Sequence, residues 1–140
     1  MKDFRELQVW HKAHQLVLVV YKGTACFPPA ERFGLTGQLR KSAVSKPSNI
    51  AEGCGRQGDR DFSRFIQIAI GSTAELEYQL LLARDLELLD EGAHQELAAQ
   101  AIEVKKMLTS LVKKLRASKK RYTQPPVFPG FQVPALGLFF

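Results

Sequence analysis

Apolar residues recur at three- and four-residue spacing along four stretches of the chain, and this spacing is typical of amphipathic helices. The first helix is expected from Arg5 to about Ala25, because Phe27-Pro28-Pro29 ends it. The second is expected to open near Ala30 or Glu31, directly after the prolines. The first part of the chain therefore predicts two helices joined by a proline turn.

The third and fourth helices follow the same logic. The third is expected to begin at Asp59 or Asp61, either of which can cap a helix N-terminus, and to end before the sequence LLDEG. The fourth carries apolar residues in steps of four and three, like a short heptad seam: Leu97, Ala101, Val104, Leu108, Leu111 and Leu115. No period-two strand pattern is evident. Long amphipathic helices with short loops favour an all-α fold, an antiparallel up-down four-helix bundle over residues 1–118.

The tail, residues 119–140, differs in composition from the bundle. From Tyr122 onward the sequence YTQPPVFPGFQVPALGLFF holds four prolines and two glycines among aromatic and aliphatic residues. The prolines argue against a helix, and the apolar content is too high for a typical disordered segment. We expect these apolar groups to lie on a surface, either of this chain's bundle or of a neighbouring subunit.

Charge is distributed unevenly along the 140 residues, whose formal net charge is +6. Residues 1–104 hold 12 basic and 14 acidic residues, whereas residues 105–140 hold eight basic residues and no acidic one. Such a block suits phosphate-rich partners, although a solvated helix end that complements the helix dipole gives the same pattern. The candidate nucleic-acid-binding residues are Lys105, Lys106, Lys113, Lys114, Arg116, Lys119, Lys120 and Arg121.

The second helix has an unusual polar face for a small bundle. Its polar residues are spaced by four and three, and Pro47 interrupts the helix: the stripe consists of Gln38, Ser42, Ser45, Asn49, Glu52 and Arg56. A solvated face is usually richer in Lys and Glu, which form helices well, than in Ser and Asn. The stripe therefore indicates an oligomer or ligand contact, and a solvated face is the alternative.

Arg40 is the exception on the apolar half of the second helix. A buried guanidinium must find a carboxylate or carbonyl groups, because an unpaired buried charge is costly. Glu77, at the edge of the third helix's apolar face, is the expected partner. The sequence thus predicts an architectural Arg40–Glu77 ion pair inside the bundle, and a functional anion site at Arg40 is the alternative.

No arrangement of residues typical of an active site, a cofactor site or a metal site is found. Glu91 and His94 have the E-x-x-H spacing of di-iron bundles, but one motif without further inward carboxylates does not make that site. Arg5 and His11 match a loose RNase spacing, yet six residues turn a helix through about 240°, so the side chains diverge. Cys26 and Cys54 are expected to be free thiols that act as small buried hydrophobic residues. No apolar run is long enough to span a membrane.

Several motifs in one order resemble a known family. They are VW near residue 10, the run FPPAERFGLTGQLR, then NIAEGCGR, and GSTAELE in the third helix. Over residues 4–115 the chain resembles the four-helix-bundle family encoded in intervening sequences of bacterial 23S ribosomal RNA genes. One departure is Lys46, which stands before Pro47 where the family pattern has an isoleucine.

This resemblance implies a small bacterial cytoplasmic protein whose bundle can assemble into a homopentameric barrel. It also implies kinship with the accessory proteins of diversity-generating retroelements, which are basic barrels that bind a reverse transcriptase and nucleic acid. We therefore expect a non-enzymatic homo-oligomeric scaffold that associates with RNA or a ribonucleoprotein, without cofactor, metal or membrane. The alternatives are a protein adaptor that does not bind nucleic acid and a divergent RNase.

Overall fold

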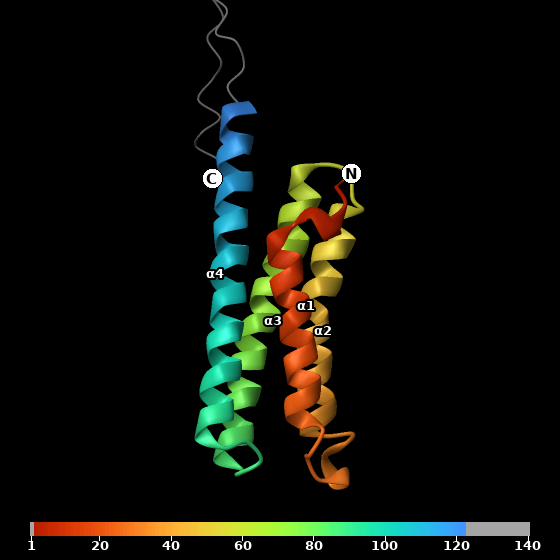
Figure 1. The fold of residues 1–140 in the computed structure, drawn as a ribbon. Coiled ribbons are helices and arrows are strands. Elements are labelled where there is room, and N and C mark those ends of the chain that lie inside the picture. The colour runs from red at the N-terminus through yellow and green to blue at the C-terminus, as the bar shows by residue number, and fades with distance from the viewer. Residues whose placement is uncertain (1, 123–140) are drawn as a thin grey trace, which may run out of the picture.

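Four helices run alternately up and down and pack side by side in the computed structural model (Figure 1). The structure describes residues 2–122, with side chains described up to residue 117, and this part of the chain contains no strand. Short 3-10 helices at Phe4–Glu6 and Pro29–Glu31 precede the first two long helices. The long helices are α1 (Gln8–Thr24), α2 (Leu35–Cys54), α3 (Asp59–Asp85) and α4 (Glu91–Tyr122). The all-α four-helix prediction is confirmed.

Helices adjacent in sequence pack against each other, and α1 also contacts α4, which closes the ring. The most extensive contact joins α2 and α3, and the contact between α1 and α4 is the smallest of the four. The core contains the predicted seam of α4 except Leu111, which is only half-buried, and Val112 takes the buried position at this level. Fully buried residues from each other helix, such as Leu16, Leu39 and Ile66, complete the core. One shared apolar core therefore holds the four helices together.

The second helix begins later than predicted. Residues 29–31 form only a 3-10 turn, and α2 starts at Leu35. The carboxylate of Glu31 accepts a hydrogen bond of 3.0 Å from the Leu35 backbone N–H. Glu31 thus satisfies an N–H group that has no partner within the helix, instead of opening the helix itself.

Two glycines near the α2–α3 turn have separate structural roles. A Cβ on Gly53 would lie 3.1 Å from the Cβ of Phe65, so glycine lets the end of α2 approach α3 closely. Gly58 precedes α3 with a φ of 91°, a conformation that other residues adopt rarely. Close packing and a tight reversal therefore explain two of the three glycines in EGCGRQG.

The upper part of α4 rises past the start of α1 (Figure 1). Leu115, near this end of α4, lines a pocket together with residues from the first turns of α3. The helix continues through residues 119–122, which the sequence analysis assigned to the tail. No helix within residues 2–122 is long and apolar enough to cross a membrane.

Candidate functional site

The polar stripe of α2 divides between the bundle interior and the surface. Ser42 is buried, and its hydroxyl donates a hydrogen bond of 3.1 Å to the Ser72 carbonyl on α3. Asn49 is half-buried and donates to the Ser45 carbonyl and hydroxyl of its own helix, at 2.7 and 3.0 Å. The predicted role of Ser42 as an oligomer or ligand contact is therefore wrong, because small polar residues let α2 and α3 approach each other here. Only Gln38, Glu52 and Arg56 of the stripe are exposed.

A lysine lies at the centre of the same interface. Lys46 is fully buried, with 0% of its surface exposed. Its ammonium donates to the Ser42 carbonyl at 2.9 Å, the Ser72 carbonyl at 3.0 Å and the Ser72 hydroxyl at 3.3 Å. Three acceptors match the three N–H donors of a lysine, so the charged form is fully hydrogen-bonded.

Burial dominates the electrostatics of this lysine. Loss of hydration lowers the pKa of Lys46 from 10.5 to about 8, although the nearby carboxylates of Glu75 and Glu77 act in the opposite direction. The sequence analysis noted Lys46 only as a departure beside Pro47. The signal that could have located it is the run of Ser42, Lys46 and Gly53 on one side of α2, because small neighbours mark a close helix contact.

The expected Arg40–Glu77 ion pair is not formed. Arg40 is half-buried, and its guanidinium donates to the Thr24 hydroxyl at 2.9 Å and lies 4.6 Å from the centre of the Tyr21 ring. Glu77 instead lies on the side of α3 that faces α4, where its Oε1 is 2.8 Å from Lys105 Nζ. Arg40 therefore joins α2 to α1, whereas Glu77, its expected partner, joins α3 to α4.

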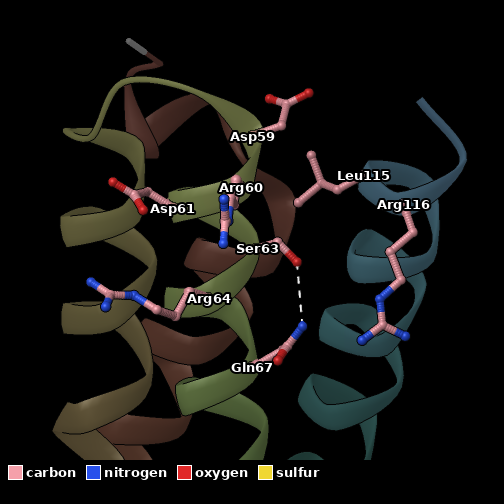
Figure 2. Close-up of a pocket in the computed structure, with 8 residues that line it drawn as sticks. All are labelled: Asp59, Arg60, Asp61, Ser63, Arg64, Gln67, Leu115 and Arg116. Atoms are coloured by element: carbon pink, nitrogen blue, oxygen red, sulfur yellow. Dashed lines mark hydrogen bonds between the residues drawn. The ribbon is translucent and has the colours of Figure 1, made fainter. Parts of the chain in front are cut away.

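Arginines of α3 and α4 lie at the upper end of the bundle, and the Arg64 side chain points away from α4 (Figure 2). The first turns of α3 and the last described turns of α4 border an open pocket of about 540 Å³. Arg60 and Arg116 contribute guanidinium groups to it, and Ser63 and Gln67 lie between the two helices. The remaining lining residues are Asp59, Asp61, Arg64 and Leu115. The pocket is thus polar, with three arginines and two aspartates.

The predicted basic residues of α4 fall into three groups. Lys105 is engaged with Glu77, so it is not free to bind phosphate. Lys106 and Lys113 line a shallow depression on the outer face of α4 with Thr109 and Ser110, and Lys114 and Arg116 are exposed nearby. Lys119, Lys120 and Arg121 lie outside the residues whose side chains are described. We call Arg60, Arg64, Lys113, Lys114 and Arg116 the cationic end.

No ion pair joins any member of the cationic end to a carboxylate within residues 2–117. Other cations in this part of the chain do form ion pairs, such as Arg56–Glu52 at 2.9 Å and Lys12–Glu103 at 3.2 Å. Arg64 instead lies over the Phe65 ring, at 5.2 Å, and Arg56 lies over the same ring at the same distance. The cationic end therefore presents guanidinium and ammonium groups that are accessible to an external anion.

Arg5 and His11 do not converge on a common site. The Arg5 side chain pairs with Asp3 at 3.4 Å and lies over the Phe4 ring at 4.4 Å. His11 Nε2 is 2.6 Å from the backbone carbonyl of Arg5, so the ring donates to the main chain in one of its tautomers. No group of three or more His, Cys, Asp or Glu side chains capable of holding a metal ion occurs in the part of the chain that the structure describes.

The two cysteines differ in environment. Cys54 is buried at the end of α2, where burial raises the pKa of its thiol. Cys26 is exposed in the turn after α1, so the prediction that it acts as a small buried hydrophobic residue is wrong. The apolar turn residue that packs into the core there is Phe27, which takes the buried position. Both thiols are free.

Comparison with known proteins gives the fold and the family. A crystal structure of a protein with unknown function from the S23 ribosomal protein family of Bacteroides thetaiotaomicron is 24% identical and has a TM-score of 0.69. The match covers 75% of this chain and 95% of that one, and it supports the bundle fold. No curated protein matches the sequence significantly. The model of the 23S rRNA-intervening sequence protein family matches residues 5–110, and the chain belongs to this family.

Proposed function

We propose that this protein is a non-enzymatic, homo-oligomeric scaffold that binds RNA or a ribonucleoprotein through the cationic end. The observation that carries the proposal is the gathering of Arg60 and Arg64 of α3 with Lys113, Lys114 and Arg116 of α4 at one end of the bundle. Exposed cations without carboxylate partners suit a phosphate backbone, because each contact releases condensed counterions. The family's link to 23S rRNA genes is consistent with an RNA partner.

The chemistry of the cationic end favours binding without base recognition. Apart from Phe65, whose ring is flanked by Arg56 and Arg64, no aromatic side chain is placed beside these cations by the contacts of residues 2–117. Sequence-specific binding of single strands usually relies on several stacking aromatics and polar groups that reach base edges. We therefore expect affinity that depends strongly on salt and little on sequence.

The test measures binding of the full chain to a fluorescent single-stranded RNA at about 50 and about 200 mM salt. A variant with Lys113→Gln, Lys114→Gln and Arg116→Gln should bind more weakly, and its log–log salt slope should be shallower by about 2, at about 0.7 per lost contact. The matched control changes Lys22, Arg32 and Lys41, which lie toward the opposite end, to Gln and alters net charge equally. This control should keep the parent slope.

Three results would contradict parts of the proposal. Absence of binding by the parent chain at low salt would eliminate the RNA partner and favour a protein adaptor. Equal weakening in both triple variants would show that total charge, rather than the cationic end, determines binding. RNA cleavage that depends on His11 would instead support the RNase alternative.

The oligomeric part of the proposal rests on a second surface. Leu18 and Tyr21 of α1 and Val44 of α2 expose 41, 43 and 36% of their surface. Arg40 contacts Tyr21, and Val44 lies one turn beyond Arg40, so these apolar groups share the outer α1–α2 face. An apolar face on a small bundle is typical of a subunit contact. The family resemblance makes a pentamer the expected assembly.

Light scattering at micromolar concentration tests this assembly. We expect an oligomer for the parent, and a lower mass for the double variant Leu18→Glu, Val44→Glu, because buried carboxylates oppose association. Ile68→Glu provides a control, since Ile68 is equally exposed, at 47%, but lies on α3. A parent that remains monomeric would contradict the oligomeric proposal and leave the RNA proposal intact.

A further inference from the structure

A second apolar surface lies where α3 and α4 meet, away from the α1–α2 face. Tyr78 and Leu81 of α3 expose 62 and 37% of their surface, and Ile102 of α4 exposes 39%. We call these three residues the α3–α4 apolar patch. Its exposed aromatic and aliphatic groups require a partner of the same apolar character.

The Glu77–Lys105 ion pair fixes the relative heights of the patch residues. Tyr78 follows Glu77 directly, and Leu81 lies one turn further along α3. Ile102 lies three residues before Lys105 on α4, which runs antiparallel to α3. The three side chains therefore lie within about one helical turn of one ion pair and at neighbouring levels.

The apolar segment formed by residues 123–140 has the composition to cover this patch. It contains four phenylalanines, two valines and two leucines, and no charged residue. The family model ends at residue 110, before this segment begins. Transfer of these apolar side chains from water to an apolar surface lowers the free energy.

The length of the chain brings the segment to the patch. Tyr122 lies 20 residues beyond Ile102, which corresponds to about 30 Å along α4. The 18 residues from 123 to 140 span at most about 60 Å when extended. About half of this extended length is enough to reach the patch from Tyr122. The other half is available to reverse the chain direction and to contact the patch.

We propose that residues 123–140 fold back along the α3–α4 face and cover the apolar patch of the same chain. The connection through α4 gives the segment a high effective concentration at this surface. A second copy lacks this covalent connection, so at low protein concentration it competes poorly with the chain's own segment for the patch. The oligomer contact proposed on α1 and α2 is left free.

Cysteine cross-linking of the full chain tests the proposal in a Cys26→Ser, Cys54→Ala background. Tyr78→Cys is combined with Phe131→Cys in one variant and with Leu136→Cys in another. The matched controls place the first cysteine at Gln15, which is exposed on α1 and belongs to neither apolar surface. With a short bifunctional maleimide, we expect at least one Tyr78 pair to cross-link within one chain at least about tenfold faster than its control.

Mixing experiments separate the outcomes. A chain carrying only Tyr78→Cys is incubated with a chain carrying only Phe131→Cys or Leu136→Cys. Cross-links that form mainly between chains would overturn docking within one chain and assign the patch to a neighbour's segment. Equal rates for the Tyr78 and Gln15 pairs would overturn any preference for the α3–α4 patch. Circular dichroism of each variant checks that the bundle is intact, as we expect for substitutions at exposed sites.

Discussion

The α2–α3 interface and the upper end of α4 both carry lysines on helices, but the two regions surround the ammonium group differently. Lys46 is enclosed by two helices and gives all three of its N–H donors to serine oxygens. Lys113 and Lys114 stand in water on the outside of α4. The same side chain is therefore a structural link in one region and a candidate phosphate ligand in the other.

The comparison shows that the role of a charged side chain depends on whether neighbouring backbone groups can bind it. In the α2–α3 interface the acceptors are mostly carbonyls of residues already in helices, which no mutation of a side chain removes. At the upper end of α4, the partner of each cation has to come from outside the described bundle. Substitutions at Lys46 should therefore change stability, and substitutions at Lys113 should change binding.

Reversal of charge gives the largest expected contrast between the two regions. Lys46→Glu places a carboxylate among the Ser42 and Ser72 carbonyls, which are acceptors, and near Glu75. We expect the free energy of unfolding to fall by about 3–5 kcal/mol, as for an uncompensated buried charge. Lys113→Glu should change it by less than about 0.5 kcal/mol. Urea unfolding followed by circular dichroism measures both, and a small loss for Lys46→Glu would contradict the buried position.

The pH dependence of stability gives the next largest effect. The pKa of Lys46 is about 8 in the folded chain and near the usual 10.5 when unfolded, so between these values the unfolded chain binds more protons. The free energy of unfolding should therefore rise by about 3 kcal/mol as the pH increases from about 8 to about 10.5. Below pH 8 the lysine is charged in both states and contributes no slope.

Lys46→Met is the control for this pH profile, because Met has a similar volume and no charge. Contributions from all other groups are common to both proteins. The difference between the two profiles isolates Lys46. Parallel profiles for the parent and Lys46→Met from pH 8 to 10.5 would show that burial does not shift the lysine.

Removal of the Arg40 side chain should have an effect between those of the buried Lys46 and the exposed Lys113. Its guanidinium is half-buried and bonds to Thr24 and Tyr21 rather than to a carboxylate. Arg40→Ala leaves no acidic partner stranded, so we expect a loss of about 1–2 kcal/mol from two hydrogen bonds and one cation–π contact. Thermal unfolding measures it. A loss of several kcal/mol would point to a partner that these contacts do not include.

The parts of the fold that follow one apolar stripe per helix were predictable from the sequence. The α4 seam from Leu97 to Leu115 and the start of α3 at Asp59 are examples. The α2–α3 interface was not predicted, because Ser42 and Ser72 are small polar residues that a periodicity analysis places on the surface. Lys46 was missed for the same reason, since its burial depends on acceptors contributed by a second helix.

The candidate site could be predicted only in part. The basic character of α4 is visible in the sequence. Two features of the cationic end depend instead on how α3 and α4 pack. Glu77 pairs with Lys105 and so excludes it from the cationic end, and α3 contributes Arg60 and Arg64. The Arg40–Glu77 prediction failed because both residues lie at helix edges, where a rotation of about one position changes the neighbouring helix. The hydrophobic pattern of one helix indicates which of its faces is buried. Which face of a neighbouring helix packs against it depends on the whole bundle.

The contrast between the two thiols makes the chain suitable for labelling at one chosen point. Cys26 is exposed in the turn below α1, whereas Cys54 is enclosed and its raised pKa keeps it in the unreactive thiol form. A maleimide dye at neutral pH should therefore attach to Cys26 without any engineered mutation. Such a dye reports from the end of the bundle opposite the cationic end, so it leaves that end free while the protein is followed by fluorescence.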